Sequence, residues 1–110
     1  MRKILLIAFV LLILLGCSTK EEYNIEKCQK IINQEKPAAA ECYFKTAMTL
    51  KNYTICEYIK GELNTRIRIQ CYNDVAAMLR DETVCDHMKV ENYSYLDFAK
   101  QQCKVYVSMR

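Results

Sequence analysis

Cysteine is the residue type with the most capacity for chemistry in this 110-residue chain, which contains seven of them. Six follow one another at separations of 14, 14, 15, 14 and 18 along the chain: Cys28, Cys42, Cys56, Cys71, Cys85 and Cys103. Such residues form structural disulfides, bind metal ions or carry out redox reactions. Zinc sites and thioredoxin-like sites both need cysteines roughly two to four residues apart, and no such pair occurs. We therefore expect structural disulfides and no metal or cofactor, with metal or redox handling as the weaker alternative.

The spacing of the cysteines also ranks the ways in which they can pair. Two residues 14 apart on one continuous helix are about 21 Å apart, so the chain must reverse direction within each bonded pair. The midpoints of three pairs fall near Pro37, Asn64 and Ser94, residue types that are typical of turns and helix starts. Sequence alone does not decide among the pairings. Helix geometry favours Cys28–Cys42, Cys56–Cys71 and Cys85–Cys103.

Patterns that would indicate catalysis are missing from the sequence. It has no Gly-rich phosphate loop, no carboxylate cluster at metal-binding spacing and no recognisable Ser/His/Asp arrangement, so we do not expect an enzyme. His87 is the single histidine and follows Asp86. A general base or a pH-dependent contact is conceivable there. We expect His87 instead to be a partly buried packing residue.

Tyrosine is the residue type that points to binding, since the chain has eight tyrosines and no tryptophan. Its side chain offers a large contact area with a polar tip, which suits a protein or glycan surface. We expect Tyr43 and Tyr72, which follow cysteines, to pack in the core. The candidates for binding lie near expected turns or helix ends: Tyr53, Tyr58, Tyr93 and Tyr95.

An internal repeat of about 29 residues organises these positions. Residues 42–59 align without gaps to residues 71–88 at a shift of 29, with six of eighteen positions identical. Each repeat begins at a residue suited to capping a helix, followed four residues later by a cysteine. These capping residues are Asn24, Asn52 and Asp81, and the three units span roughly residues 24–51, 52–80 and 81–110.

Each unit is predicted to contain two helices joined by a turn. Apolar residues recur at helical spacing, and Pro37, residues 61–64 and residues 92–94 interrupt the pattern. Asn64 and Ser94 are candidate second caps, and Ser94-x-x-Asp97 resembles a capping box. The expected helices span residues 25–35, 38–51, 53–61, 65–80, 82–91 and 95–108. The predicted fold is all-α, with three disulfide-stapled helical hairpins packed in series over residues 24–110.

The N-terminus has the pattern of an export signal. Arg2 and Lys3 precede twelve apolar residues, Ile4 to Leu15, which are too few to cross a membrane as a helix. The end of this run together with the next two residues, Leu14-Leu15-Gly16-Cys17, resembles a prokaryotic lipobox. By this resemblance the chain is identified as a member of the membrane lipoprotein class. The resemblance implies a signal peptide over residues 1–16 and a tether over residues 17–23 with palmitate or another acyl chain on Cys17. An ordinary signal peptide or an uncleaved anchor is the alternative.

The charge balance limits the partners of the mature chain. Without Arg2 and Lys3, 14 basic residues remain against 13 acidic ones, a net charge of +1, so we expect no nucleic-acid partner. The resemblance implies a chain anchored by lipid on the extracytoplasmic side of the cell membrane or outer membrane. We expect a non-enzymatic module that binds a protein or cell-envelope component. A structural, accessory or inhibitory envelope lipoprotein is the alternative.

Overall fold

The computed structural model describes residues 24–90 and 94–109, and within these ranges the protein is all-helical, without a β-strand. Three longer helices dominate: α3 (Pro37–Leu50), α4 (Thr65–Leu79) and α6 (Leu96–Ser108). A shorter element precedes each of them: α2 (Ile25–Gln29), the 3-10 helix η1 (Tyr53–Tyr58) and α5 (Thr83–Asp86). A second 3-10 turn, η2 (Glu62–Asn64), leads into α4. None of the helices in the described ranges combines the length and apolarity needed to span a membrane.

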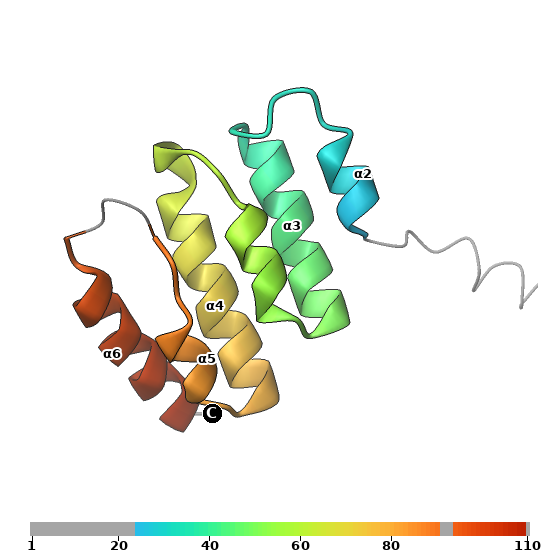
Figure 1. Ribbon diagram of the computed structural model, residues 1–110. Helices are drawn as coiled ribbons and strands as arrows, with labels where there is room; N and C mark the ends of the chain where they lie inside the picture. The colour runs from blue at the N-terminus through green and yellow to red at the C-terminus, as the bar shows by residue number, and fades with distance from the viewer. Residues whose placement is uncertain (1–23, 91–93, 110) are drawn as a thin grey trace, which may run out of the picture.

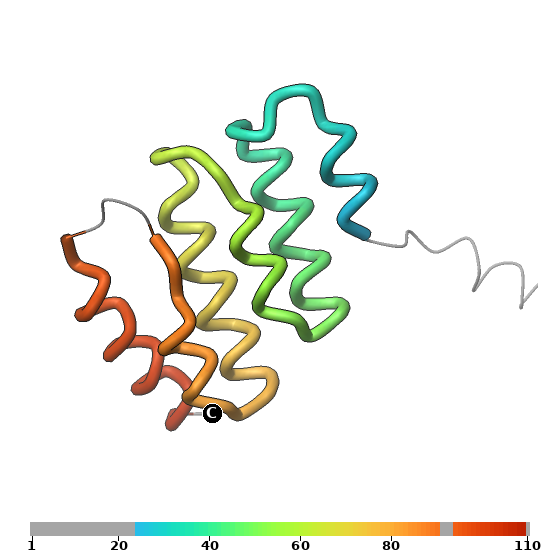
Figure 2. Tube along the Cα trace, viewed as in Figure 1, coloured from blue at the N-terminus to red at the C-terminus, as the bar shows by residue number. Residues whose placement is uncertain are grey.

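The long helices lie side by side with the short elements packed along them (Figure 1). Helix α4 is central and contacts both α3 and α6, while α2 packs on α3, η1 on α3 and α4, and α5 on α4 and α6. Figure 2 shows that the chain runs along each short element in one direction and returns along the next long helix. The turns at residues 30–36 and 59–64 therefore lie at one end of the molecule.

Three disulfides tie each short element to the long helix that follows it. They are Cys28–Cys42, Cys56–Cys71 and Cys85–Cys103, with Cα–Cα distances of 5.5, 5.7 and 5.7 Å. These are the pairs that the sequence favours. Because helices of four to six residues are not stable alone in water, the disulfides and tertiary packing must hold the short elements in place. All-helical architecture and three disulfides are thus confirmed.

The short elements are much shorter than the predicted helices 25–35, 53–61 and 82–91, and here the prediction is wrong. Helix α4 has 15 residues and is about 22 Å long. In the second unit, a helix as long as α4 would need as many residues to run back along it, but only the segment 52–64 is present. The backbone is extended at Ile59, with φ −68° and ψ 118°, and an extended residue advances about 3.3 Å against 1.5 Å in a helix. The change from helical to extended backbone lets this short segment run the length of α4.

The ends of α3 and α4 are built alike, at equivalent positions of the repeat. Lys51 and Arg80 are both in the left-handed region, with φ of 52° and 53°, which costs a side-chain-bearing residue about 1–2 kcal/mol. Hydrogen bonds offset this cost. The next N–H, of Asn52 or Asp81, donates to a carbonyl five residues earlier at 3.0 Å in both cases. In this arrangement at the end of a helix, the residue in the left-handed conformation is usually glycine.

Two of the three predicted N-terminal caps, Asn24 and Asn52, cap their helices, whereas the residue that precedes α5 is Glu82 rather than Asp81. Asn24 Oδ1 accepts a hydrogen bond from the N–H of Lys27 at 2.8 Å. Asn52 Oδ1 accepts both the N–H and the hydroxyl of Thr54, at 3.1 and 2.7 Å. Asp81 Oδ1 does the same with Thr83, at 3.0 and 2.6 Å, although α5 itself begins two residues later, after Glu82.

The two predicted second caps behave differently from expectation. Asn64 does precede α4, but its side chain makes no capping bond. It is 1% exposed, and its Nδ2 donates to the carbonyls of Glu35 and Lys60 at 2.7 and 2.8 Å, which ties the two described turns together. The residue that precedes α6 is Tyr95 rather than Ser94, and no side-chain cap is present there. The Ser94-x-x-Asp97 capping box is therefore wrong.

The core combines small residues with cystine and a few large side chains. Ala39, Ala40, Ala47 and Ala76 are fully buried on the long helices and let neighbouring elements approach closely. Five of the six paired cysteines have no exposed surface. The largest side chains that fill the remaining space are Tyr43, Tyr72, Ile55, Ile59 and Met88. A core this thin explains why covalent links matter in a chain of this size.

Candidate functional site

The tyrosines divide into buried and outward-facing ones. Tyr43 and Tyr72 are buried, as expected for core packing. Of the four candidates for binding, Tyr58 is 39% exposed and Tyr95 is 65% exposed, while Tyr53 is partly buried. Tyr93 lies outside the described residues, as does the predicted lipidation site Cys17.

Two stacking contacts fix the outward-facing rings on the layer of short elements. Tyr58 stacks on the buried Tyr43, with ring centroids 5.5 Å apart and planes 17° apart. Tyr53 stacks on His87 at 4.9 Å and 22°, and its ring also lies 6.5 Å from that of the buried Tyr72. We call Tyr53, Tyr58 and His87 the outer ring set. Stacked aromatic pairs contribute about 0.5–1.5 kcal/mol beyond their buried area, so these rings are held in fixed orientations.

His87 differs from its predicted role. It is exposed rather than partly buried, although the Tyr53 ring stacks on one of its faces. The sequence did not indicate this contact, since Tyr53 and His87 are not equivalent positions in the repeat. Tyr95 belongs to another part of the fold: it directly precedes α6, whereas Tyr53 and Tyr58 belong to η1.

A hollow with charged walls lies on the same layer. Its lining residues are Glu35, Glu57, Ile59, Lys60, Gly61, Arg68 and Lys89. Lys89 Nζ is 3.6 Å from Glu57 Oε1, and both side chains are well exposed. Arg68 Nε donates to the Ile59 carbonyl at 2.6 Å, which holds the guanidinium against the wall. An exposed ion pair such as Glu57–Lys89 contributes little to stability, so both charges remain available for a partner.

The buried hydroxyls next to this layer stay protonated at neutral pH. Burial raises the pKa of Tyr72 to about 12, the negative charge of Glu57 adds to the increase, and the backbone of Lys89 opposes it. No residue in the described part of the chain makes a well-formed hydrogen bond with Tyr72 Oη. Burial, and next the neighbouring Tyr58, also raise the pKa of Tyr43. The hydroxyls are therefore hydrogen-bond donors rather than bases.

Two carboxylates in or just before α5 are held ionised by hydrogen-bond donors. The pKa of Asp86 is lowered by the hydrogen bond from Lys104 Nζ, which lies 2.9 Å away and joins α5 to α6. The pKa of Asp81 is lowered chiefly by the hydroxyl of Thr83. Both are acceptors in structural contacts, and neither is poised to transfer a proton.

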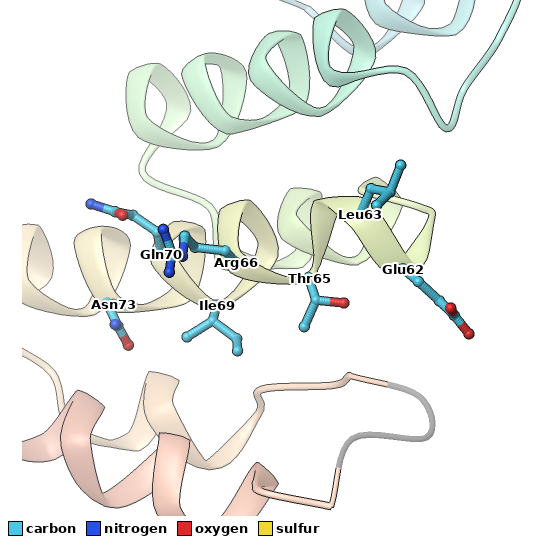
Figure 3. Close-up of a pocket in the computed structure, with 7 residues that line it drawn as sticks. All are labelled: Glu62, Leu63, Thr65, Arg66, Ile69, Gln70 and Asn73. Atoms are coloured by element: carbon cyan, nitrogen blue, oxygen red, sulfur yellow. The ribbon is translucent and has the colours of Figure 1, made fainter.

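A second hollow runs along the other exposed side of η2 and α4 (Figure 3). Figure 3 shows Thr65, Ile69 and Asn73 on one side of α4 and Leu63 extending away from η2. The remaining lining residues are Glu62, Arg66 and Gln70. These side chains offer scattered polar contacts, and they do not form a pair of groups with complementary acid and base roles.

The cysteines and acidic groups do not form a metal site in the part of the chain that is described. No group of three His, Cys, Asp or Glu side chains converges within residues 24–90 and 94–109. The six predicted disulfide cysteines are all bonded to one another in pairs. What the geometry brings together is therefore a set of fixed rings beside a charged hollow.

No family model, no curated protein and no solved structure matches the chain. What the protein does must therefore be argued from its own residues.

Proposed function

We propose that this chain is a small lipid-anchored module on the extracytoplasmic side of a membrane, and that it binds a protein or cell-envelope component without catalysing a reaction. The observation that carries the binding proposal is the outer ring set, in which exposed or partly buried rings are stacked on other rings beside a charged hollow. Because these rings already have fixed orientations, a partner would lose little conformational entropy in ordering them. Tyrosine is enriched at such surfaces.

Export is supported by the disulfides together with the N-terminal sequence. Three disulfides persist in oxidising compartments and are rare in a reducing cytosol. The lipobox-like Leu14-Leu15-Gly16-Cys17 supplies an anchoring cysteine that is separate from the six paired ones. In this proposal residues 1–16 are removed, Cys17 carries the lipid, and residues 17–23 form the tether.

We further propose that the domain is a series of three related hairpins, each a short element and a long helix joined by a disulfide. Support comes from two pairs of residues that are equivalent in the repeat: Lys51 and Arg80, which are both left-handed, and Asn52 and Asp81, whose side chains accept equivalent hydrogen bonds. Stacked repeats present an extended outer surface, which is how many such proteins bind partners.

The cysteines favour this proposal over metal or redox handling. A thiolate is the group that binds metal or attacks a disulfide, and paired cysteines provide none until they are reduced. Among the six, all but Cys42 have no exposed surface. The remaining alternative, an envelope protein that acts only as a structural or accessory part, makes no use of exposed rings.

Site-specific photo-crosslinking tests the binding surface. A photoreactive phenylalanine analogue replaces Tyr58 in one variant and Tyr95 in a matched control, and both are irradiated in membranes of the host cell. We expect one discrete adduct from position 58, suppressed by excess native chain but not by excess chain carrying Tyr58→Ala. No adduct at position 58, or the same adduct from position 95, would support the accessory role instead.

A further inference from the structure

Two neighbouring turns at one end of the molecule carry large apolar side chains that the fold leaves uncovered. We call residues 30–36 and 59–66 the turn end; the 2.7 Å hydrogen bond from the Asn64 side chain joins its two parts. Ile32 is 103% exposed, and Leu63 is 93% exposed and extends away from η2 (Figure 3). Single exposed leucines are common on protein surfaces, but large apolar side chains on two joined turns indicate a surface that another molecule covers.

The turn end also has an excess of positive charge. Its basic residues are Lys30, Lys36, Lys60 and Arg66, its acidic residues are Glu35 and Glu62, and all six are exposed. The net charge is therefore +2, and none of the four cations forms an ion pair within residues 24–90 and 94–109. Apolar side chains next to unpaired cations fit the interface of a bilayer with anionic headgroups, where the apolar groups reach the acyl chains and the cations bind phosphate.

The opposite end of the molecule exposes apolar side chains as well, but its charges cancel. Leu50, Leu79 and Met109 end or follow the three long helices and are 55%, 40% and 79% exposed. The segments 51–52 and 80–82, which connect the hairpins at this end, contain the basic Lys51 and Arg80 and the acidic Asp81 and Glu82. An anionic surface therefore attracts the turn end more strongly than the opposite end.

The tether in the proposed function keeps the domain next to a bilayer. Residues 17–23 are seven residues, which span about 25 Å at most when fully extended. This span is similar to the length of α4, so the tether lets either end of the domain reach the bilayer and holds it near the surface. Such a linkage gives a high effective concentration of membrane, so even a weak affinity of the turn end orients the domain.

We propose that the turn end is a membrane-contacting surface, in which Ile32 and Leu63 insert at the interface of the bilayer and the four basic side chains bind the phosphate groups of anionic lipids. The inference rests on the proposed function for the lipid anchor that brings this surface to the bilayer. The layer of short elements lies along the helices rather than at their ends (Figure 1). The outer ring set therefore stays accessible to a partner while the turn end contacts lipid.

Tryptophan fluorescence tests the contact, because the chain has no tryptophan of its own. Ile32→Trp and Leu63→Trp place a ring in the turn end, and Leu50→Trp is the matched control at the opposite end. Tryptophan itself favours membrane interfaces, so the control carries the same preference. Each full oxidised chain is purified from membranes and reconstituted in vesicles of phosphatidylcholine and phosphatidylglycerol with brominated acyl chains. We expect positions 32 and 63 to lose about half or more of their fluorescence to the bromine atoms, and position 50 to lose little.

Charge variants separate a built surface from general attraction to lipid. In the Ile32→Trp chain, Lys36→Gln together with Lys60→Gln should weaken the contact about tenfold or more, as should vesicles of phosphatidylcholine alone. Lys51→Gln together with Arg80→Gln removes the same charge at the opposite end and should leave the quenching unchanged, because salt screens charges over that distance.

Three results would overturn the proposal: no quenching at positions 32 and 63, equal quenching at position 50, or shielding of position 32 from iodide in water without quenching by brominated lipid. The last result would mean that a second copy of the chain covers this end. The mass of the N-terminal peptide reports the lipid anchor separately. A lipidated chain without the difference between the two ends keeps the proposed anchor and refutes the turn-end contact. An unlipidated chain that shows the difference does the reverse.

Discussion

Tyr43 and Tyr72 occupy equivalent positions on α3 and α4 but differ in one hydrogen bond, which allows a paired stability experiment. Both rings are buried. Tyr43 Oη donates to Gln34 Oε1 at 2.5 Å, whereas Tyr72 Oη has no acceptor in the described part of the chain. Replacing either tyrosine by phenylalanine removes one hydroxyl and leaves the ring in place, so the two variants isolate the value of that bond.

The expected magnitudes follow from these partners. Tyr43→Phe loses a hydrogen bond worth about 1 kcal/mol and leaves Gln34 Oε1 without its donor, so we expect the free energy of unfolding to fall by about 1–2 kcal/mol. Gln34 also donates to the carbonyls of Cys28 and Ile31, at 2.9 and 2.7 Å, so its position matters for the first turn. Tyr72→Phe removes an unpartnered buried hydroxyl, and we expect no loss, or a gain of up to about 1 kcal/mol.

Guanidinium unfolding of the oxidised native chain and both variants, followed by circular dichroism, measures these differences. The slope of free energy against denaturant should be the same in all three, since neither change alters the surface exposed on unfolding. Equal destabilisation by Tyr72→Phe and Tyr43→Phe would contradict the difference between the two hydroxyls. An unchanged stability of Tyr43→Phe would contradict the value given to the Tyr43–Gln34 hydrogen bond.

Three further outcomes are expected. Gly61→Ala should lower the free energy of unfolding by about 1–2 kcal/mol in the same assay, because φ is +95° and a Cβ would lie 3.2 Å from Glu35 Cβ; an unchanged midpoint would contradict this. Replacing both Cys56 and Cys71 by alanine should lower the free energy of unfolding by about 3 kcal/mol, because the loop that the disulfide closes, with a sequence separation of 15, becomes free in the unfolded chain. A stability equal to that of the native chain would show that this disulfide is dispensable. The free energy of unfolding should fall by about 2–3 kcal/mol as pH rises from 10 to 12, because Tyr72 loses its proton near pH 10 in the unfolded chain and only at about 12 in the folded chain. In a series of unfolding curves at different pH, Tyr72→Phe should remove most of that fall. If the fall persists in Tyr72→Phe, groups other than Tyr72 cause it.

The framework of the fold could be predicted because it depends on spacing along the chain. Cysteines at sequence separations of 14, 15 and 18 can bond only where the chain reverses direction, and the turn-type residues near the midpoints favoured the three pairs that the structure contains. The long helices α3, α4 and α6 match the predicted segments within a residue or so, since apolar periodicity marks their buried faces. Local capping also followed from sequence, because Asn52 bonds within two residues of itself.

Features that depend on distant contacts could not be predicted. The short elements end early, and buried Ile59 and Met88 follow η1 and α5 outside a regular helix. Apolar periodicity does not distinguish that arrangement from a longer helix. Asn64 resembles a helix cap in sequence, but its side chain donates a hydrogen bond to the carbonyl of Glu35, 29 residues earlier in the chain. The Tyr53–His87 stack likewise joins two elements whose approach no local pattern encodes.

Within the candidate site, composition indicated that tyrosine is the relevant residue type, but not which tyrosines present their rings outward. The excess of tyrosine pointed to ring-mediated binding, and Tyr53 and Tyr58 do present rings on the layer of short elements. The charged hollow gave no sequence signal, because Arg68 and Lys89 meet only after α4 and the segment following α5 pack together.

Mass spectrometry of the chain purified from the membrane fraction of cells, with thiols blocked before extraction, tests most directly whether this is an exported, disulfide-tied and lipid-anchored module. We predict an N-terminus at Cys17 carrying an acyl modification, no blocked thiol, and peptides linked as Cys28–Cys42, Cys56–Cys71 and Cys85–Cys103. A chain that retains residues 1–16, lacks lipid and carries six blocked thiols would contradict it.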